Sequence, residues 1–125
     1  MLRWTSPVIS FLRTATADVS LNGQAIKAGD TLCLFYPSAN RDERVFADAD
    51  RFDITRDPNP HITFGFGAHF CLGANLAKAE LKSILKALLG ILPQLELTGE
   101  SHRLGNTHVS GFSLLGVRRA GQGGT

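Results

Sequence analysis

The chain has 125 residues, 43% of them hydrophobic and 19% charged, which excludes a disordered or fibrous class and allows one modest core in one domain. The net charge of +2 is not gathered into a run of like charges, so nothing indicates a nucleic-acid partner. No stretch approaches the roughly eighteen apolar residues of a membrane span, and no signal-peptide pattern is present. We therefore expect a cytoplasmic protein without a membrane span, whose two cysteines are reduced.

The first third of the chain predicts short strands. An apolar run at residues 8–12 is extended in character, and the Asn-Gly pair at 22–23 predicts a hairpin over residues 19–26, because this pair accepts the positive φ angles of a two-residue turn. The continuous apolar run Thr31–Tyr36 predicts a strand buried on both faces. Cys33 lies inside this run, so we expect it to be a small, unreactive core residue.

The rest of the chain predicts one long helix between irregular and extended segments. The polar stretch 37–60 is expected to be a long irregular connection with a functional role. An amphipathic helix packed on a core is predicted over residues 72–92, where apolar residues recur at helical spacing and three lysines line another face. These lysines are Lys78, Lys82 and Lys86. Segments around 95–97 and 109–117 predict a final strand pair, and residues 119–125 a flexible tail.

The segment between the irregular connection and the long helix contains the residues that most strongly indicate a cofactor site. Cys71 is expected to open the helix, where unpaired backbone N–H groups and the helix dipole favour a thiolate. Gly65, Gly67 and Gly73 surround it, and glycine removes side chains where a flat, bulky cofactor has to approach the backbone. Cys71 is therefore a candidate anionic ligand in a loop with room for a macrocycle.

The ten residues Phe64-Gly-Phe-Gly-Ala-His-Phe-Cys-Leu-Gly73 resemble the haem signature of the cytochrome P450 family, Phe-x-x-Gly-x-(His or Arg)-x-Cys-x-Gly, at every defined position. The resemblance implies haem b as the cofactor and Cys71 as the axial thiolate ligand of its iron, a ligand that favours O–O cleavage. It also implies that Phe64 shields the sulfur, that His69 binds a haem propionate, and that the glycines at 65 and 73 belong to the cofactor site.

Two arginine motifs extend the resemblance. The run Arg3-Trp-Thr-Ser-Pro-Val8 resembles the end of the family's Glu-x-x-Arg helix, whose glutamate would lie immediately before Met1. The run Ala49-Asp-Arg-Phe52 resembles the Pro-x-Arg-Phe motif, with alanine in place of proline, and implies that Arg51 completes a buried Glu-Arg-Arg network. Without the glutamate, Arg3 and Arg51 lack their family partner. Burying two unpaired arginines close together would cost a large amount of free energy.

The resemblance continues in segments that face the cofactor and substrate in the family. Arg13 matches a second propionate-binding arginine, and Val8–Phe11 and Ser110–Phe112 match segments that line the substrate pocket. The whole resembling part, residues 1–118, implies an α+β piece of the mainly α-helical P450 fold, its C-terminal portion, with small sheets and the cysteine loop. We expect a truncated gene product or a start codon assigned inside a longer frame.

The activity implied by the resemblance is that of a haem-thiolate monooxygenase, which inserts one oxygen atom from O2 into an apolar organic substrate. Its electrons would come from a ferredoxin- or flavodoxin-type partner on the proximal face, where the lysines of the predicted helix would help docking. The distal acid and threonine of the family have no counterpart here, so no catalytic residue is expected in this chain. The alternative is a small non-catalytic α+β remnant that no longer binds haem.

Other interpretations of the same residues are weaker. A zinc site from His61, His69 and Cys71 lacks a fourth ligand nearby in sequence. A nucleotide-binding glycine loop at 65–67 lacks its third glycine, which Phe70 replaces, and no acidic residue follows about twenty residues later. The three lysines are also consistent with an ordinary solvent-facing side of a helix.

Overall fold

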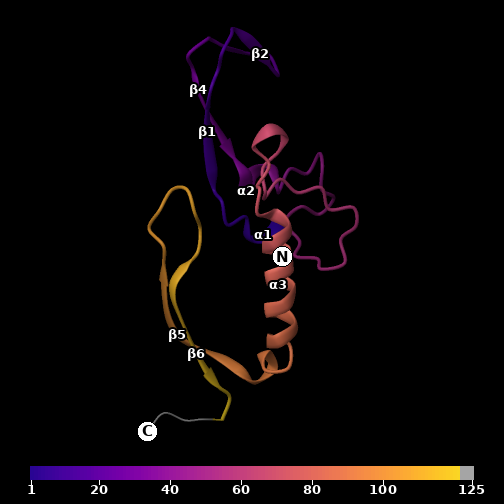
Figure 1. The fold of residues 1–125 in the computed structure, drawn as a ribbon, viewed down its shortest axis with the longest axis vertical. Helices are drawn as coiled ribbons and strands as arrows, with labels where there is room; N and C mark the ends of the chain where they lie inside the picture. The colour runs from indigo at the N-terminus through magenta and orange to yellow at the C-terminus, as the bar shows by residue number, and fades with distance from the viewer. Residues whose placement is uncertain (122–125) are drawn as a thin grey trace. The chain divides into compact units, whose positions relative to one another are not determined.

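The structure is a computed structural model that describes residues 1–121 (Figure 1). The chain divides into two compact units, each described by itself. The first comprises residues 1–63 with 106–110, and the second comprises 64–105 with the residues from 111 onward. Small antiparallel sheets and few helices make up both units, which confirms the expected α+β class.

The first unit is built from two short helices and two antiparallel strand pairs (Figure 1). Its elements are α1 (Leu2–Thr5), β1 (Ser10–Thr14), β2 (Val19–Leu21), β3 (Gln24–Ile26), β4 (Thr31–Phe35) and α2 (Tyr36–Ala39). Strand β1 pairs with β4, and β2 pairs with β3. The turn between β2 and β3 has φ angles of 50° at Asn22 and 81° at Gly23, which confirms the hairpin predicted from this pair.

The prediction that Thr31–Tyr36 is a strand buried on both faces is wrong for most of the run. Strand β4 has a single neighbouring strand, and of its five residues only Leu32 is partly buried. Cys33, which lies opposite Leu12, is exposed rather than part of a core. Tyr36, at the start of α2, is buried. A two-stranded sheet covers neither of its own faces, so an apolar run in it stays accessible.

The core of the first unit lies where the irregular connection meets α1 and α2. Its buried apolar side chains are Tyr36, Phe46 and Ala49, and its buried polar residues are Arg3, Ser6, Asn40 and Thr63. Residues 40–63 form turns and bends without a further helix or strand, as predicted for most of 37–60, whereas residues 37–39 belong to α2. Because no helix or strand pairs the backbone groups of this segment, polar side chains hydrogen-bond to them instead.

The second unit contains one long helix and a strand pair. Its elements are η1 (Gly67–His69), α3 (Ala74–Leu88), η2 (Leu92–Gln94), β5 (Leu95–Arg103) and β6 (Phe112–Arg119), of which η1 and η2 are short 3-10 helices. Strands β5 and β6 pair antiparallel, with Leu97 opposite Val117 (Figure 1). The predicted final pair is thus present. Strand β5 is longer than the predicted segment 95–97, and β6 is displaced toward the C-terminus from the predicted 109–117.

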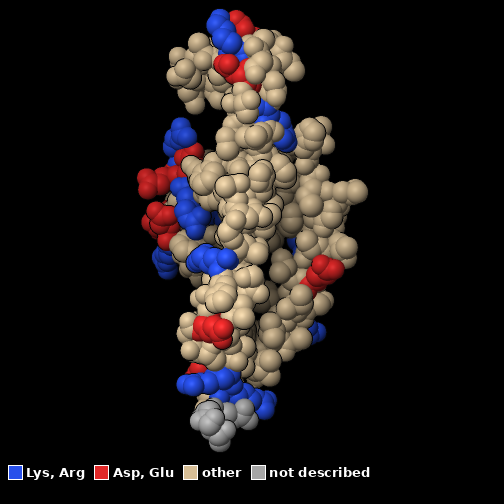
Figure 2. All heavy atoms as spheres, turned by 90° about the vertical axis from the view of Figure 1, so that its left-hand side faces the viewer, with Lys and Arg blue, Asp and Glu red and all other residues tan. Residues whose placement is uncertain are grey.

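Helix α3 is shorter than the predicted 72–92 and buries its apolar side only in part, since Leu85 and Leu88 are partly buried. It starts after Gly73, and Pro93 falls in the 3-10 turn that follows it. Leu76 is 64% exposed and Ile84 is 54% exposed. In the view of the molecule in Figure 2, residues other than Lys, Arg, Asp and Glu form most of the surface. The amphipathic pattern therefore correctly indicates a helix, whereas its apolar side is only partly covered and not fully packed on a core.

The end of the chain is partly paired. Arg119 lies opposite Leu95 in the β5–β6 pair, and the Ala120 amide donates to the Gln94 carbonyl at 2.7 Å. Of the predicted tail 119–125, Arg119 therefore belongs to β6 and Ala120 follows it in a turn, and residues 122–125 lie outside the described residues. Within residues 1–121, no helix has the length and apolar character needed to cross a bilayer.

Candidate functional site

The segment before α3 is a closed loop that ends at Cys71. The Cys71 amide donates to the Phe64 carbonyl at 2.8 Å, and inside this closure the Phe70 amide donates to the Gly67 carbonyl at 3.0 Å. Gly65 and Gly67 have φ angles of 78° and 67°, in the left-handed region that L side chains rarely adopt. Both glycines are thus required by the backbone path that brings the two ends of the loop together.

Cys71 stands between this loop and α3, not within the first turn of the helix. Its carbonyl accepts the Ala74 amide at 3.2 Å, and Gly73 is the N-cap residue. The helix therefore begins at Ala74 and not at Cys71, so the prediction that the cysteine opens the helix is wrong. The Cys71 side chain is a free, exposed thiol. A ligand from outside the unit can consequently reach the sulfur.

Aromatic side chains surround the loop closure. Phe64 is partly buried and meets Phe70 edge to face, with ring centroids 6.4 Å apart and planes at 63°. On α3, the Lys78 ammonium lies 5.6 Å from the centroid of the Phe64 ring. Phe66 and Leu72, by contrast, are 87% and 103% exposed. The contact of Lys78 with Phe64 therefore joins the loop to α3, while Phe66 and Leu72 are exposed apolar side chains.

The geometry around the sulfur fits a flat apolar cofactor such as haem. A methyl group added at Gly73 would lie 3.9 Å from the Cys71 sulfur, an ordinary van der Waals contact, so Gly73 borders the sulfur. A methyl group at Gly67 would meet nothing within 4 Å. A single thiolate donor with accessible aromatic and aliphatic neighbours is the donor set of a haem-thiolate site. The residues present thus fit the group that the sequence signature implies.

The predicted cofactor-binding residues are divided between the two units. Phe64, Gly65, His69, Cys71 and Gly73 all belong to the second unit, where His69 is exposed at the end of η1. Arg13 belongs to the first unit, where its guanidinium donates to its neighbour's carbonyl, that of Leu12, at 2.8 Å. The roles of His69 and Arg13 toward propionates stay predictions.

The alternative zinc interpretation is not supported by the arrangement of its residues. His61 belongs to the first unit, and its ring Nδ1 accepts the Thr63 amide at 3.3 Å. Among residues 1–121, no three His, Cys, Asp or Glu side chains are grouped so that they could hold a metal ion together.

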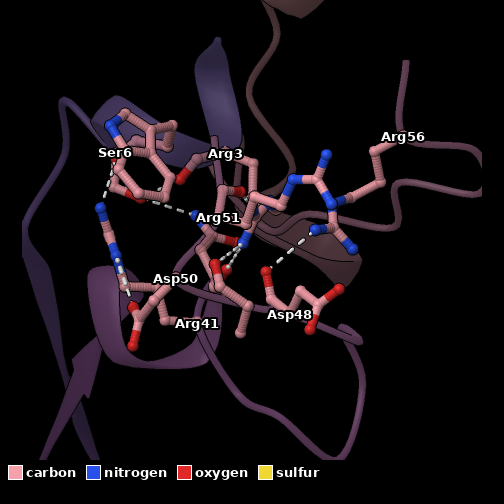
Figure 3. A network of polar contacts seen from close by, with 10 residues as sticks. Arg3, Ser6, Arg41, Asp48, Asp50, Arg51 and Arg56 are labelled. Carbon is pink, nitrogen blue, oxygen red and sulfur yellow. Dashed lines mark hydrogen bonds and ion pairs between the residues drawn. The ribbon is translucent and has the colours of Figure 1, made fainter. Parts of the chain in front are cut away.

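Arg3 is the most buried charged residue and is fully engaged (Figure 3). Its Nη1 donates to the carbonyl oxygens of Asn40 at 2.7 Å and Ala49 at 2.8 Å, and its Nη2 donates to that of Arg51 at 3.2 Å. The guanidinium also lies 4.9 Å from the centroid of the Phe46 ring. Burial lowers the pKa of Arg3 from its ordinary value. The guanidinium thus ties the beginning and the middle of the irregular connection to α1.

The expectation of two buried, unpaired arginines is therefore wrong. Backbone carbonyls satisfy Arg3, and Arg51 contributes its carbonyl to this network while its side chain is exposed. A fork of donors matches several carbonyls at once, so no carboxylate is needed to satisfy the guanidinium here.

Two further arginines of this region were not anticipated from the sequence (Figure 3). Arg41 donates to the Trp4 carbonyl at 2.8 Å and pairs with Asp50 at 3.6 Å. Arg56 donates to the carbonyls of Ala47 at 2.7 Å and Asp48 at 3.1 Å. An arginine in a polar stretch ordinarily indicates a solvated charge, so no sequence signal distinguishes these two.

The family model for "Cytochrome P450" matches residues 1–92 of the chain. Cytochrome P450-terp from Pseudomonas sp. is 54% identical over 117 residues, which are 94% of this chain and 27% of that protein. The steroid C26-monooxygenase of Mycolicibacterium smegmatis is 50% identical over 101 residues, which are 81% of this chain and 25% of that protein. The chain thus spans about a quarter of the length of these curated relatives.

Solved structures give the same result for the fold. CYP109E1 from Bacillus megaterium, in complex with testosterone, matches with a TM-score of 0.89 and 40% identity over 95% of this chain and 34% of that chain. P450BioI, in complex with an acyl carrier protein ligated with hexadec-9Z-enoic acid, matches with a TM-score of 0.89 and 37% identity over 94% of this chain and 31% of that chain. The loop that ends at Cys71 thus occurs in a chain that belongs to the cytochrome P450 family.

Proposed function

We propose that this chain supplies the haem-ligand portion of a P450 monooxygenase, with Cys71 as the axial thiolate of haem b. The observation that carries the proposal is the closed loop from Phe64 to Cys71, which exposes a single free thiol beside accessible apolar side chains. Bound through a cysteine thiolate, haem iron favours O–O cleavage and so supports insertion of one oxygen atom from O2 into an organic substrate.

The residues of the second unit would each have a definite task in holding the group. The Cys71 thiol has to lose its proton to bind iron, because the thiolate is the ligating form. The Phe64 carbonyl holds the backbone of Cys71 through the 2.8 Å hydrogen bond. Phe66 and Leu72 are exposed apolar side chains that a flat apolar group would cover, with a gain from apolar burial. His69 and, from the first unit, Arg13 would donate to propionates.

The proposed substrate is an apolar organic molecule. Curated relatives are named as a steroid C26-monooxygenase and a methyl-branched lipid omega-hydroxylase, and CYP109E1 is seen with testosterone. Residues 1–118 are proposed to be the C-terminal part of a single P450 domain, in a cytoplasmic protein.

The proposed partner is an acidic ferredoxin- or flavodoxin-type protein that docks on α3. Lys78, Lys82 and Lys86 are spaced four residues apart and are all exposed, so they form one basic stripe along the helix. Such a stripe would steer an acidic protein toward the cysteine loop and speed its association at low salt. Among the similar solved structures, P450BioI is seen in complex with an acyl carrier protein.

A haemin titration of the 125-residue chain, followed by absorbance, tests this function. The chain has two exposed cysteines, so Cys33→Ser is a matched control for Cys71→Ser. We expect one haem per chain in the unchanged protein and in the Cys33 variant, and much weaker binding in the Cys71 variant. Equal binding in both variants would overturn the assignment of Cys71. A folded chain that takes up no haem would favour the non-catalytic α+β alternative.

A further inference from the structure

Lys78 differs from the other two lysines of the basic stripe by its contact with the cysteine loop. Its ammonium lies 5.6 Å from the centroid of the Phe64 ring, a distance at which the ring quadrupole attracts a cation. Lys82 and Lys86 lie about 6 and 12 Å further along the helix axis, at a rise of roughly 1.5 Å per residue. Within the described residues, Lys78 is thus the lysine of the stripe whose ammonium lies over an aromatic ring of the loop.

The residue that Lys78 contacts is also the one that fixes the backbone of Cys71. The Phe64 carbonyl accepts the Cys71 amide at 2.8 Å. The Phe64 ring also meets the Phe70 ring edge to face, with the ring centroids 6.4 Å apart. Phe70 is in turn tied to Gly67 through its amide. Lys78 is therefore linked to Cys71 through Phe64, by the contact of the ammonium with the ring and by the hydrogen bond from the Cys71 amide to the Phe64 carbonyl.

We propose that Lys78 is a positioning residue for Cys71, because its contact with Phe64 fixes the loop closure that places the sulfur. This inference rests on the proposed function, in which Cys71 binds haem iron. It assigns Lys78 a task inside the second unit that needs no partner protein, whereas Lys82 and Lys86 keep only their charge on the helix surface. The Lys78 ammonium fixes the loop by occupying the face of the Phe64 ring, so a residue without charge at this position loosens the closure.

The test compares Lys78→Met with Lys78→Arg, Lys82→Met and Lys86→Met in the full 125-residue chain. Methionine keeps a long aliphatic side chain without charge, and arginine keeps a cation that binds aromatic faces. The first readout is hydrogen exchange of the Cys71 amide in the chain without haem. The second is the one-electron reduction equilibrium of the haem-loaded chain, measured without a partner protein.

We expect Lys78→Met to speed exchange of the Cys71 amide about two- to fivefold, the range that corresponds to an exposed cation–ring contact. It should also change the reduction equilibrium constant by at least about twofold more than Lys82→Met does, since both variants lose one charge. Lys78→Arg should restore both values. The Lys82 and Lys86 variants should leave the exchange rate unchanged.

Identical exchange rates and reduction equilibria in Lys78→Met and Lys82→Met would overturn the inference, as would a failure of arginine to restore the original values. The exchange readout decides the role of Lys78 even in a chain that binds no haem. A failure of the proposed function and a failure of this inference therefore give different results.

Discussion

The side-chain amide of Asn40 donates to the hydroxyl of Thr63 at 3.0 Å, and both residues are buried. The same amide donates to the Ser6 hydroxyl at 2.8 Å, and the Asn40 side-chain oxygen accepts the Ile62 amide at 2.9 Å. One asparagine thus joins the end of α1, α2 and the last residues of the irregular connection. Thr63 is the last residue of the first unit before the cysteine loop begins in the second.

Replacement of Asn40 by alanine should destabilise the first unit strongly. The change leaves the Ile62 amide without its acceptor, while the Ser6 and Thr63 hydroxyls keep their hydrogen bonds to the Arg3 and Leu2 carbonyls, and we expect a loss of about 1–3 kcal/mol in the free energy of unfolding. Asn59→Ala is the matched control, because Asn59 lies in the same connection and is exposed. Denaturant unfolding measures both variants, and equal stabilities would show that the buried network contributes little.

Asp42 should titrate at an unusually low pH. Hydrogen bonds from the Arg44 guanidinium and amide lower the pKa of the Asp42 carboxyl from 3.8 to about 2. The folded-state pKa lies below the unfolded one, so the stabilising contribution is complete above pH 3.8 and is lost as the pH falls toward 2. An NMR titration of the carboxyl carbon should show this midpoint, and Arg44→Gln should return it toward 3.8. A midpoint that does not move in the variant would contradict the assigned cause.

Gly67→Ala should strain the cysteine loop without a steric clash. A methyl group at this position would meet nothing within 4 Å, so the cost comes from the φ angle of 67°, and we expect about 1–2 kcal/mol. Gly90→Ala is the control, because Gly90 also has open space around it and is not in the left-handed region. Thermal unfolding and haemin titration should both show a loss for the first variant only. A haem affinity equal to that of Gly90→Ala would argue against a preformed loop.

Gly73→Ala should separate cofactor binding from folding. Gly73 has a φ angle of −84°, which alanine adopts without strain, so the stability should stay within about 0.5 kcal/mol of the original. The new methyl group would lie 3.9 Å from the Cys71 sulfur, in van der Waals contact with it. We therefore expect a haemin titration to show severalfold weaker binding. Unchanged affinity would mean that the cofactor does not need this side of the sulfur.

Local features of the fold were predictable because a few adjacent residues determine them. Asn22 and Gly23 together supply the positive φ angles of their turn, so the hairpin needs no information from elsewhere in the chain. The helical spacing after Cys71 similarly predicts α3, although the helix begins only after Gly73 and already ends at Leu88, inside the predicted 72–92. Short motifs therefore predict which helices and strands form, but not what packs against them.

Burial was not predictable in the same way, because it depends on what covers an element. Cys33 lies in an apolar run but in a sheet of only two strands, and it is exposed. Ile84 lies on the apolar side of α3 and is 54% exposed. Asn40 shows the reverse case, since a polar residue in a polar stretch is fully buried because three separate segments converge on its side chain.

The sequence predicts which residues would form the candidate site, but not the contacts among them. The signature correctly places Phe64 and Cys71 in one loop, but it does not predict that the carbonyl of the first holds the amide of the second. The contact of Lys78 with Phe64 likewise depends on the path of the backbone around the two glycines. Sequence spacing alone would give all three lysines of α3 the same task.

The most direct test of Cys71 as haem ligand is the difference spectrum of the dithionite-reduced, carbon monoxide-bound chain after loading with haemin. We predict a Soret band at the red-shifted position of thiolate-ligated haem in the unchanged chain and in Cys33→Ser, and loss of that band in Cys71→Ser. A red-shifted band that persists in Cys71→Ser, or a folded, haem-loaded chain that never shows it, would contradict the assignment of Cys71 as the iron ligand.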